Sequence, residues 1–469
     1  MPTHRPLHVD AATDDGGPQL RLCDGAFHVG CDMEGTFPGA CSGWQRSSIR
    51  SDATIGVHTQ LDWMTMLERT PTAQAFQRKA IVLSIGLFIA TFLLTRQTQI
   101  DALNGLGAPW ALLMTIAFLR VERSWQLLIP MVLYASTSAL ASSVTGHDAG
   151  SVLRFYVITI GTLLAFCVRP IRISAKVALL PLVLQAVIVS GISLYLGYAR
   201  DDELAAAVRG YVLSTEWGDI YSFDGIYYRV QLIGNALLPF LFLVSLWKYR
   251  EARFFRWVTF ISFVGVIAAG NLTYSIVIAI GMLVHARAWL RRHVIKWFAL
   301  VAAVCIGTVA FWGDIDEIVT RKFDGSDSSM GIRFDQVDVA VRAWEESPAL
   351  LLVGSGLGAP YPNGKERDYS QYQYIELQAL YLLIQLGLVG MLIYVATLVL
   401  AANSFLNTDG RTIFWLYVLS GATNPTIFDT NQIVATIILI CLFPRNPKSV
   451  GTRVRSSSQP QCSQLTSMS

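Results

Sequence analysis

The chain has 469 residues, of which 53% are hydrophobic and only 15% are charged, whereas about 25% are charged in an ordinary soluble protein. Apolar runs of about 17–25 residues recur, the length that crosses a hydrocarbon layer about 30 Å thick. This composition excludes an ordinary soluble protein, and the formal net charge of +3 is too small to argue for a nucleic-acid partner. We therefore expect an all-α polytopic membrane protein.

Residues 1–76 are polar, rich in Gly, Asp and Thr, and show neither helical nor strand periodicity. This composition is typical of a disordered segment, because it offers too little apolar surface to bury. Its three cysteines lack the C-x-x-C spacing of a zinc site. Translation from Met64 or Met66 is an alternative for this segment. The tail, 446–469, is rich in Ser and Gln and is also expected to be disordered.

The middle of the chain, residues 77–445, is predicted to be one multi-span membrane domain. It contains about twelve apolar runs that we interpret as transmembrane helices. They cover 80–95, 103–119, 124–143, 152–168, 174–198, 231–247, 254–270, 272–288, 296–312, 376–401, 411–423 and 430–443. The seventh and eighth runs meet at Asn271 with almost no loop, which predicts a tight helical hairpin.

Lysine and arginine gather in alternate short loops, and the other short loops are nearly bare of them, with Arg96 and Arg154 as the main exceptions. Cytoplasmic loops of membrane proteins carry such an excess of positive charge. The asymmetry predicts that both termini are cytoplasmic and that two long connections, 199–230 and 313–375, are periplasmic. Because the spans contain few charges, we look for chemistry in these two outer loops.

The second outer loop contains the stretch SSMGIRFDQVDVAVRAWEESP, residues 328–348. It predicts an amphipathic helix near 330–346, which Pro348 ends. At 100° per residue, its acids and Arg342 share one polar arc. The opposite side is apolar and consists of Phe334, Val337, Ala340, Val341 and Trp344. Arg333 falls on this apolar side, where an unpaired guanidinium is costly.

Arg333 has two explanations. It forms an internal salt bridge or bends out to water, or it faces a cleft and binds phosphate through its planar, two-pronged guanidinium. Glu376 opens the next span and is either an interfacial carboxylate at a helix N-terminus or a general base. Arg229, at the membrane edge of the first outer loop, is by itself typical of an anchor that snorkels to the interface.

A glycine-rich turn, Gly354-Ser-Gly356-Leu-Gly358, follows the amphipathic helix. It is either a plain flexible turn or a site where backbone N–H groups point toward an anion. An acidic triplet, Asp314, Asp316 and Glu317, resembles the D-x-D of metal-dependent glycosyltransferases. A solvated loop start is the better interpretation of the triplet, and we expect neither a metal nor another cofactor.

Several of these features follow one another in a recognisable order: Arg333, Trp344, Pro348, the glycine-rich turn, and a span with Gly387-Leu-Val-Gly390. In this order they resemble the superfamily of Wzy-type O-antigen polymerases and WaaL-type O-antigen ligases. The segment from Arg229 to Phe240 is similar to the family's R-x-x-G-x-x-x-N-P motif before a span. The resemblance covers roughly 227–443.

The resemblance implies chemistry on undecaprenyl-diphosphate-linked glycans at the outer face of the bacterial inner membrane, without a metal or a nucleotide sugar. It implies that Arg333 and Arg229 bind the diphosphate and that Glu376 is the catalytic base, where a ligase has histidine. The other candidate substrate-binding residues are Gln231, Asn235, Tyr274, Trp344, Gly354, Gly356, Tyr372 and Tyr374. The aromatic residues among them either stack on sugars or belong to an interfacial belt.

Neither long outer loop contains a histidine, which favours a polysaccharide polymerase over a lipopolysaccharide ligase. A polymerase of exopolysaccharide repeats, of the xanthan (GumE-like) type, is the specific expectation. The family's S-R pair is missing from the hairpin at Asn271, where the sequence reads GNLTYS. The expected partners are the lipid-linked oligosaccharide, membrane lipid, and chain-length and export proteins.

Other classes of function remain open. The alternatives are an O-antigen ligase-like transferase, a lipid-linked-oligosaccharide flippase or transporter, and a structural subunit of an export complex. A transporter built from twin repeats should show two similar halves, and the sequence shows none, because its longest loop lies far from the centre.

Overall fold

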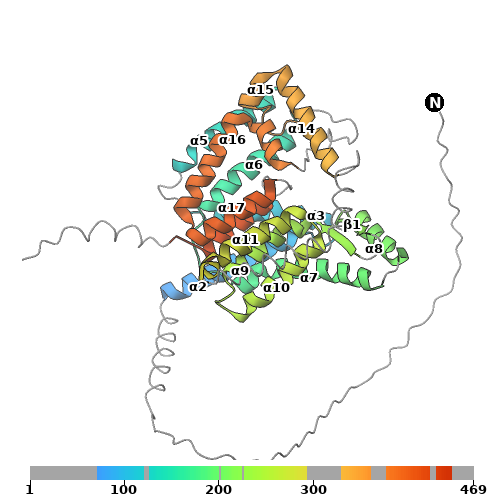
Figure 1. Ribbon diagram of the computed structural model, residues 1–469. Helices are drawn as coiled ribbons and strands as arrows, with labels where there is room; N and C mark the ends of the chain where they lie inside the picture. The colour runs from blue at the N-terminus through green and yellow to red at the C-terminus, as the bar shows by residue number, and fades with distance from the viewer. Residues whose placement is uncertain are drawn as a thin grey trace, which may run out of the picture. The chain divides into compact units, whose positions relative to one another are not determined.

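The structure is a computed structural model that describes residues 71–120, 126–199, 202–223, 227–292, 329–360, 377–422 and 429–445. All of them belong to one compact unit. The helices are α2 (Pro71–Leu94), α3 (Asp101–Asn104), α4 (Gly107–Ala117), α5 (Ile129–Val144), α6 (Ala149–Phe166), α7 (Ala175–Ala199), α8 (Asp202–Ser214), η2 (Ile233–Leu237), α9 (Leu238–Trp247), α10 (Arg253–Ala269), α11 (Leu272–Arg292), α14 (Ser329–Glu346), α15 (Pro348–Val353), α16 (Gln378–Phe405), α17 (Thr408–Ala422) and α18 (Thr430–Leu442) (Figure 1).

The protein is a mostly helical, polytopic membrane protein. Among the described residues, four helices, α2, α6, α7 and α16, are long and apolar enough to cross a membrane. Shorter apolar helices accompany them. Helices coincide with every expected run except 296–312, which lies outside the described residues. The number of spans and their orientation stay predictions.

One boundary and one connection differ from expectation. Helix α2 begins at Pro71 and not after residue 76, because proline is tolerated in the first turn of a helix. The first long connection, which is predicted to be an outer loop, contains α8 (Asp202–Ser214) and a two-stranded antiparallel hairpin of β1 (Gly218–Phe223) and β2 (Tyr227–Leu232). The expected all-α class is therefore wrong in this detail. The expectations for 1–70 and 446–469 concern residues outside the described part.

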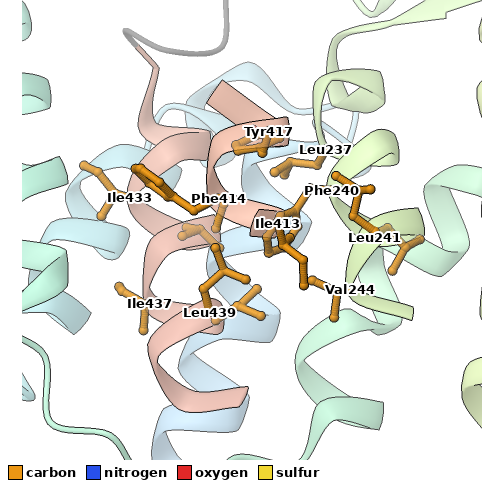
Figure 2. Close-up of a cluster of buried hydrophobic side chains, with 14 of the residues drawn as sticks. Leu237, Phe240, Leu241, Val244, Ile413, Phe414, Tyr417, Ile433, Ile437 and Leu439 are labelled. Carbon is orange, nitrogen blue, oxygen red and sulfur yellow. The ribbon is translucent and has the colours of Figure 1, made fainter. Parts of the chain in front are cut away.

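Helices α9, α17 and α18 supply the core (Figure 2). Every residue from Leu238 to Ser245 of α9 is buried, and so is every residue from Thr430 to Cys441 of α18. A helix that is apolar all round is expected to lie inside a bundle. Figure 2 shows Phe240 of α9 near Tyr417 of α17, with their ring centres 5.3 Å apart, while Ile433 of α18 packs against Gly161 of α6.

The hairpin expected at Asn271 is confirmed. Helix α10 ends at Ala269 and α11 begins at Leu272. Gly270 between them adopts the left-handed conformation, with φ 60° and ψ 24°, which glycine enters without steric cost. The Asn271 side chain then accepts a hydrogen bond from the Thr273 N–H at 3.0 Å, so this asparagine caps the start of α11.

Candidate functional site

The expected amphipathic helix is confirmed as α14 (Ser329–Glu346). Pro348 occupies the first turn of the next helix, α15, as proline commonly does. On the exposed side of α14, Arg342 pairs with Asp338 one turn earlier. This part of the polar arc is therefore exposed to solvent and internally neutralised.

The buried face of α14 differs from expectation. Gln336 is 3% exposed and Ala340 1%, whereas Phe334, on the side expected to be buried, is 63% exposed. Arg333 and Trp344 are partly buried and lie along the same face as Gln336 and Ala340. A helical pattern shows which residues share a face, but it does not show whether protein or lipid covers that face. Arg333 thus lies at the edge of the protein-facing side.

The glycine-rich turn after α15 docks on a break in α16. Gly387 has φ 64° and ψ 178°, which interrupts the helix. Gly354 has φ 78°, and a Cβ atom at either glycine would collide with the backbone around the other. The two backbones therefore approach so closely that only glycine fits at both positions.

The N–H groups of this turn are used within the protein. Ser355 N–H donates to Ile384 O at 2.7 Å, and Gly356 N–H donates to Gln385 O at 3.0 Å. Gly358 N–H donates to the side chain of Gln385 at 3.4 Å. Since these groups already have acceptors, the turn does not present them to an anion. Gly354 and Gly356 thus support packing, and the plain-turn interpretation fits the geometry better.

Tyr134 of α5 completes the joint between the turn and α16. Its hydroxyl lies 2.6 Å from Leu386 O and 3.1 Å from Val353 O, carbonyls next to the break. Its ring packs on Gly390, where a Cβ would overlap it. The two glycines of the Gly387-Leu-Val-Gly390 motif therefore have separate roles: the first permits the break and the second makes room for the tyrosine.

Replacing Tyr134 by phenylalanine should lower the free energy of unfolding by about 1 kcal/mol, because the carbonyls at the break lose a donor. Thermal unfolding of the purified protein in detergent measures the change. Tyr198→Phe is the control, since the Tyr198 side chain is 89% exposed and its hydroxyl meets solvent or lipid headgroups. Equal stability of the Tyr134→Phe and Tyr198→Phe proteins would contradict this role.

The β-hairpin presents one apolar and one polar face. Ile220, Tyr228, Val230 and Leu232 are at most 4% exposed and form its inner face. The other face pairs Tyr221 with Arg229 and Asp219 with Gln231 across the strands. Figure 1 shows β1 beside α8. This alternation has a period of two residues, as expected for a strand. It was not recognised in the sequence because β2 is followed directly by an apolar span.

Arg229 is held by several groups on this polar face. Its Nε–H donates to Ala269 O, at the C-terminal end of α10, at 3.4 Å. With its amide oxygen turned toward the guanidinium, Gln231 accepts from Nε at 3.0 Å. The guanidinium carbon lies 5.7 Å from the centre of the Tyr221 ring. Two predicted site residues, Arg229 and Gln231, therefore lie together.

An ion pair from α8 supports the same face. Nε and Nη2 of Arg209 donate to Oδ1 and Oδ2 of Asp219 at 2.8 and 3.2 Å, respectively. Partial burial raises the pKa of Asp219, but hydrogen bonds from Arg209, the Ile220 N–H and the Tyr221 hydroxyl outweigh burial and hold it below its usual value. The carboxylate is therefore ionised at neutral pH and engaged by Arg209.

Asn235 has a different position from its predicted partners. It is 4% exposed, its Nδ2 donates to Val230 O at 2.8 Å, and its Oδ1 accepts from Gln185 of α7 at 3.1 Å. Both ends of this amide are therefore used to fasten the hairpin to α7. The geometry supports a structural role for Asn235 better than substrate contact.

Four polar side chains in the bundle interact electrostatically, one with the next, and the first of them interacts with Arg229 of the hairpin. Tyr274 of α11 is buried and close enough to Arg229 to interact with it electrostatically. Tyr417 of α17 interacts in the same way with Tyr274 and with Asp429. Asp429 in turn interacts with Arg154, at the start of α6. These groups come from helices α6, α11 and α17, from the N-cap of α18, and from strand β2.

Asp429 and Arg154 belong to this group of polar residues and were not among the predicted site residues. The Asp429 carboxylate accepts from the Thr430 N–H and from the Asn431 side chain, both at 2.6 Å, and so caps α18. Arg154 also interacts electrostatically with Tyr381 of α16. For each residue the sequence offered a signal. Arg154 is one of the two arginines that are exceptions to the charge asymmetry of the short loops, and Asp429 is an acid directly before an apolar span, as Glu376 is.

Three predicted site residues, Glu376, Tyr372 and Tyr374, lie outside the described residues, as does the acidic triplet at 314–317. Among those that are described, Arg229, Gln231 and Tyr274 come together, and Arg333 and Trp344 share α14. The described part of the site therefore has two components in a polytopic membrane protein: an arginine-containing group at the β-hairpin, and α14 with Arg333.

Part of the chain is similar to a known protein family. Residues 257–395 match the model of the Wzy_C family, described as O-antigen ligase. No curated protein matches the chain. The matched region runs from α10 to α16 and includes Tyr274, Arg333 and Glu376, whereas Arg229 lies before it. It is narrower than the expected region of resemblance, 227–443. Enzymes of this family transfer lipid-linked glycans.

Proposed function

We propose that the protein is a polysaccharide polymerase. It transfers a growing glycan from undecaprenyl diphosphate to a lipid-linked repeat unit at the periplasmic face of the bacterial inner membrane. The observation that carries this proposal is the family match over 257–395, which contains Arg333 on the protein-facing edge of α14. The absence of histidine from both long outer loops favours polymerisation over ligation.

The reaction uses two cations and one base. The bond between the donor sugar's anomeric carbon and the diphosphate oxygen breaks, and its electron pair leaves with the diphosphate. A hydroxyl of the acceptor repeat forms the new glycosidic bond and gives its proton to Glu376. Arg333 and Arg229 stabilise the negative charge on the departing diphosphate, which is the larger electrostatic contribution. No metal takes part in this scheme.

Purified protein in lipid vesicles with undecaprenyl-diphosphate-linked repeats tests the proposal. Polymerisation gives a ladder of products on a gel, with a xanthan-like polymer as the specific candidate product. Transfer to a lipopolysaccharide core without a ladder would identify a ligase, the alternative that the family's description favours. Movement of intact repeats across the vesicle with no new bond would identify a flippase. Either of the last two results overturns the polymerase.

Replacing Glu376 by glutamine should reduce the initial rate of glycan transfer by about 100-fold or more, as expected for the loss of a general base. The rate is measured at saturating substrate, so that a change in binding does not enter. Glu345→Gln, on the exposed side of α14, removes a carboxylate from the same outer loop and should leave the rate unchanged. A Glu376→Gln protein with the wild-type rate would exclude this residue as the base.

A further inference from the structure

We propose that Tyr221 is a positioning residue for Arg229. The Tyr221 ring holds the Arg229 guanidinium in the orientation in which it binds a diphosphate. The inference rests on the proposed function, in which Arg229 contacts the diphosphate of the lipid-linked donor. It adds a residue that neither the sequence motifs nor the family match includes, since Tyr221 lies before residue 257.

The hairpin register places the two side chains together. Tyr221 and Arg229 are opposite each other in the antiparallel pair, so their side chains leave the sheet on the same face. The guanidinium carbon lies 5.7 Å from the ring centre, within the reach of about 6 Å for a cation–π contact. The other contacts of this guanidinium described above are a carbonyl and an amide. Together with the ring, these contacts fix the direction of the guanidinium.

The ring itself is held in place from α8. The Tyr221 hydroxyl donates to Asp219, and Asp219 forms the ion pair with Arg209. The Arg209 guanidinium also lies 5.7 Å from the ring centre. Because Arg209 engages both oxygens of Asp219, the acid of this face is neutralised by α8. Because the ring is fixed, the Arg229 side chain that packs on it loses less conformational freedom when it binds an anion.

Binding of undecaprenyl diphosphate to the purified protein in nanodiscs tests the inference. Tyr221→Leu should weaken binding about five-fold, the effect expected when one cation–π contact is lost. Tyr221→Phe keeps the ring and should bind within about two-fold of wild type. If Tyr221→Leu lowers the yield of folded protein, Tyr221→Thr takes its place, because threonine is favoured in strands.

The chain offers a matched control at a second tyrosine–arginine pair. The Arg256 guanidinium lies 5.8 Å from the ring centre of Tyr249, and Tyr249 is 43% exposed, against 41% for Tyr221. This pair lies in and after the connection between α9 and α10, away from the hairpin in sequence. Tyr249→Leu removes an equivalent contact and should leave binding of undecaprenyl diphosphate unchanged.

A double-mutant cycle separates positioning from direct contact. Arg229→Gln should weaken binding by more than ten-fold on the scale of a lost charge-assisted phosphate contact. If Tyr221 acts through Arg229, Tyr221→Leu adds nothing further to Arg229→Gln. Additive losses would show that Tyr221 binds the ligand on its own and would overturn the inference. Wild-type binding by Tyr221→Leu alone would also overturn it, whereas wild-type binding by Arg229→Gln would remove Arg229 from the proposed function.

Discussion

An Arg333→Ala protein should lose glycan transfer by at least about 100-fold, the scale seen when one donor to a developing negative charge is removed. Arg333 is on the protein-facing edge of α14, beside Gln336 and Ala340, which are almost fully buried. In the proposed function this guanidinium stabilises the departing diphosphate, and water screens a partly buried charge less than it screens an exposed one. Gel analysis of polymer from reconstituted protein measures the loss.

The matched control is Arg342→Ala. Arg342 is nine residues further along the same helix, its side chain is 67% exposed, and it pairs with Asp338. Exposed pairs of this kind contribute at most about 1 kcal/mol to stability, so its removal should leave transfer intact. Full-length polymer from the Arg333→Ala protein, at wild-type expression, would exclude Arg333 from catalysis.

The second large effect is expected for Gly387→Ala, which should prevent the turn after α15 from docking on α16. A residue with a Cβ at positive φ and ψ near 180°, the conformation of Gly387, costs about 1–3 kcal/mol, and here the Cβ would also overlap the backbone at Leu352 and Gly354. The structure cannot relieve this overlap by turning a side chain, because the colliding atoms belong to the main chain. We expect a lower yield of folded protein and a lower unfolding temperature in detergent.

Gly191→Ala supplies the comparison for Gly387. Gly191 is inside α7, and a Cβ there would have no neighbour within 4 Å. Alanine in a helix interior is favoured over glycine by about 1 kcal/mol, so this protein should be as stable as wild type or more so. If Gly387→Ala matched Gly191→Ala in unfolding temperature, the close approach of the two backbones would be refuted.

The sequence was sufficient to predict most of the helices and their order. Apolar length alone located the described spans, and the position of Asn271 predicted the tight turn between α10 and α11. The amphipathic period likewise predicted α14. These features succeed because each depends on residues close together in the chain, and a membrane enforces the apolar pattern over a whole span.

Features that depend on distant contacts were not predictable. Nothing local shows that Gly354 and Gly387 touch, or that Asn235 spans from the hairpin to Gln185. The inner face of α14 was misjudged because Phe334 and Val337 are apolar, yet 63% and 39% exposed. In a membrane protein, apolar residues point to lipid as readily as to protein, so hydrophobicity alone does not identify the packed side.

The break at Gly387 also couples the position of α15 to that of α16. Arg333 precedes the glycine-rich turn and Glu376 follows it, and the turn is fastened partway along α16 through Gly354. Helix α15 and the first half of α16 are therefore joined by main-chain contacts at this turn. A displacement of α15 would therefore pass to the first half of α16 through main-chain contacts, because the atoms that meet at Gly354 and Gly387 belong to the backbone.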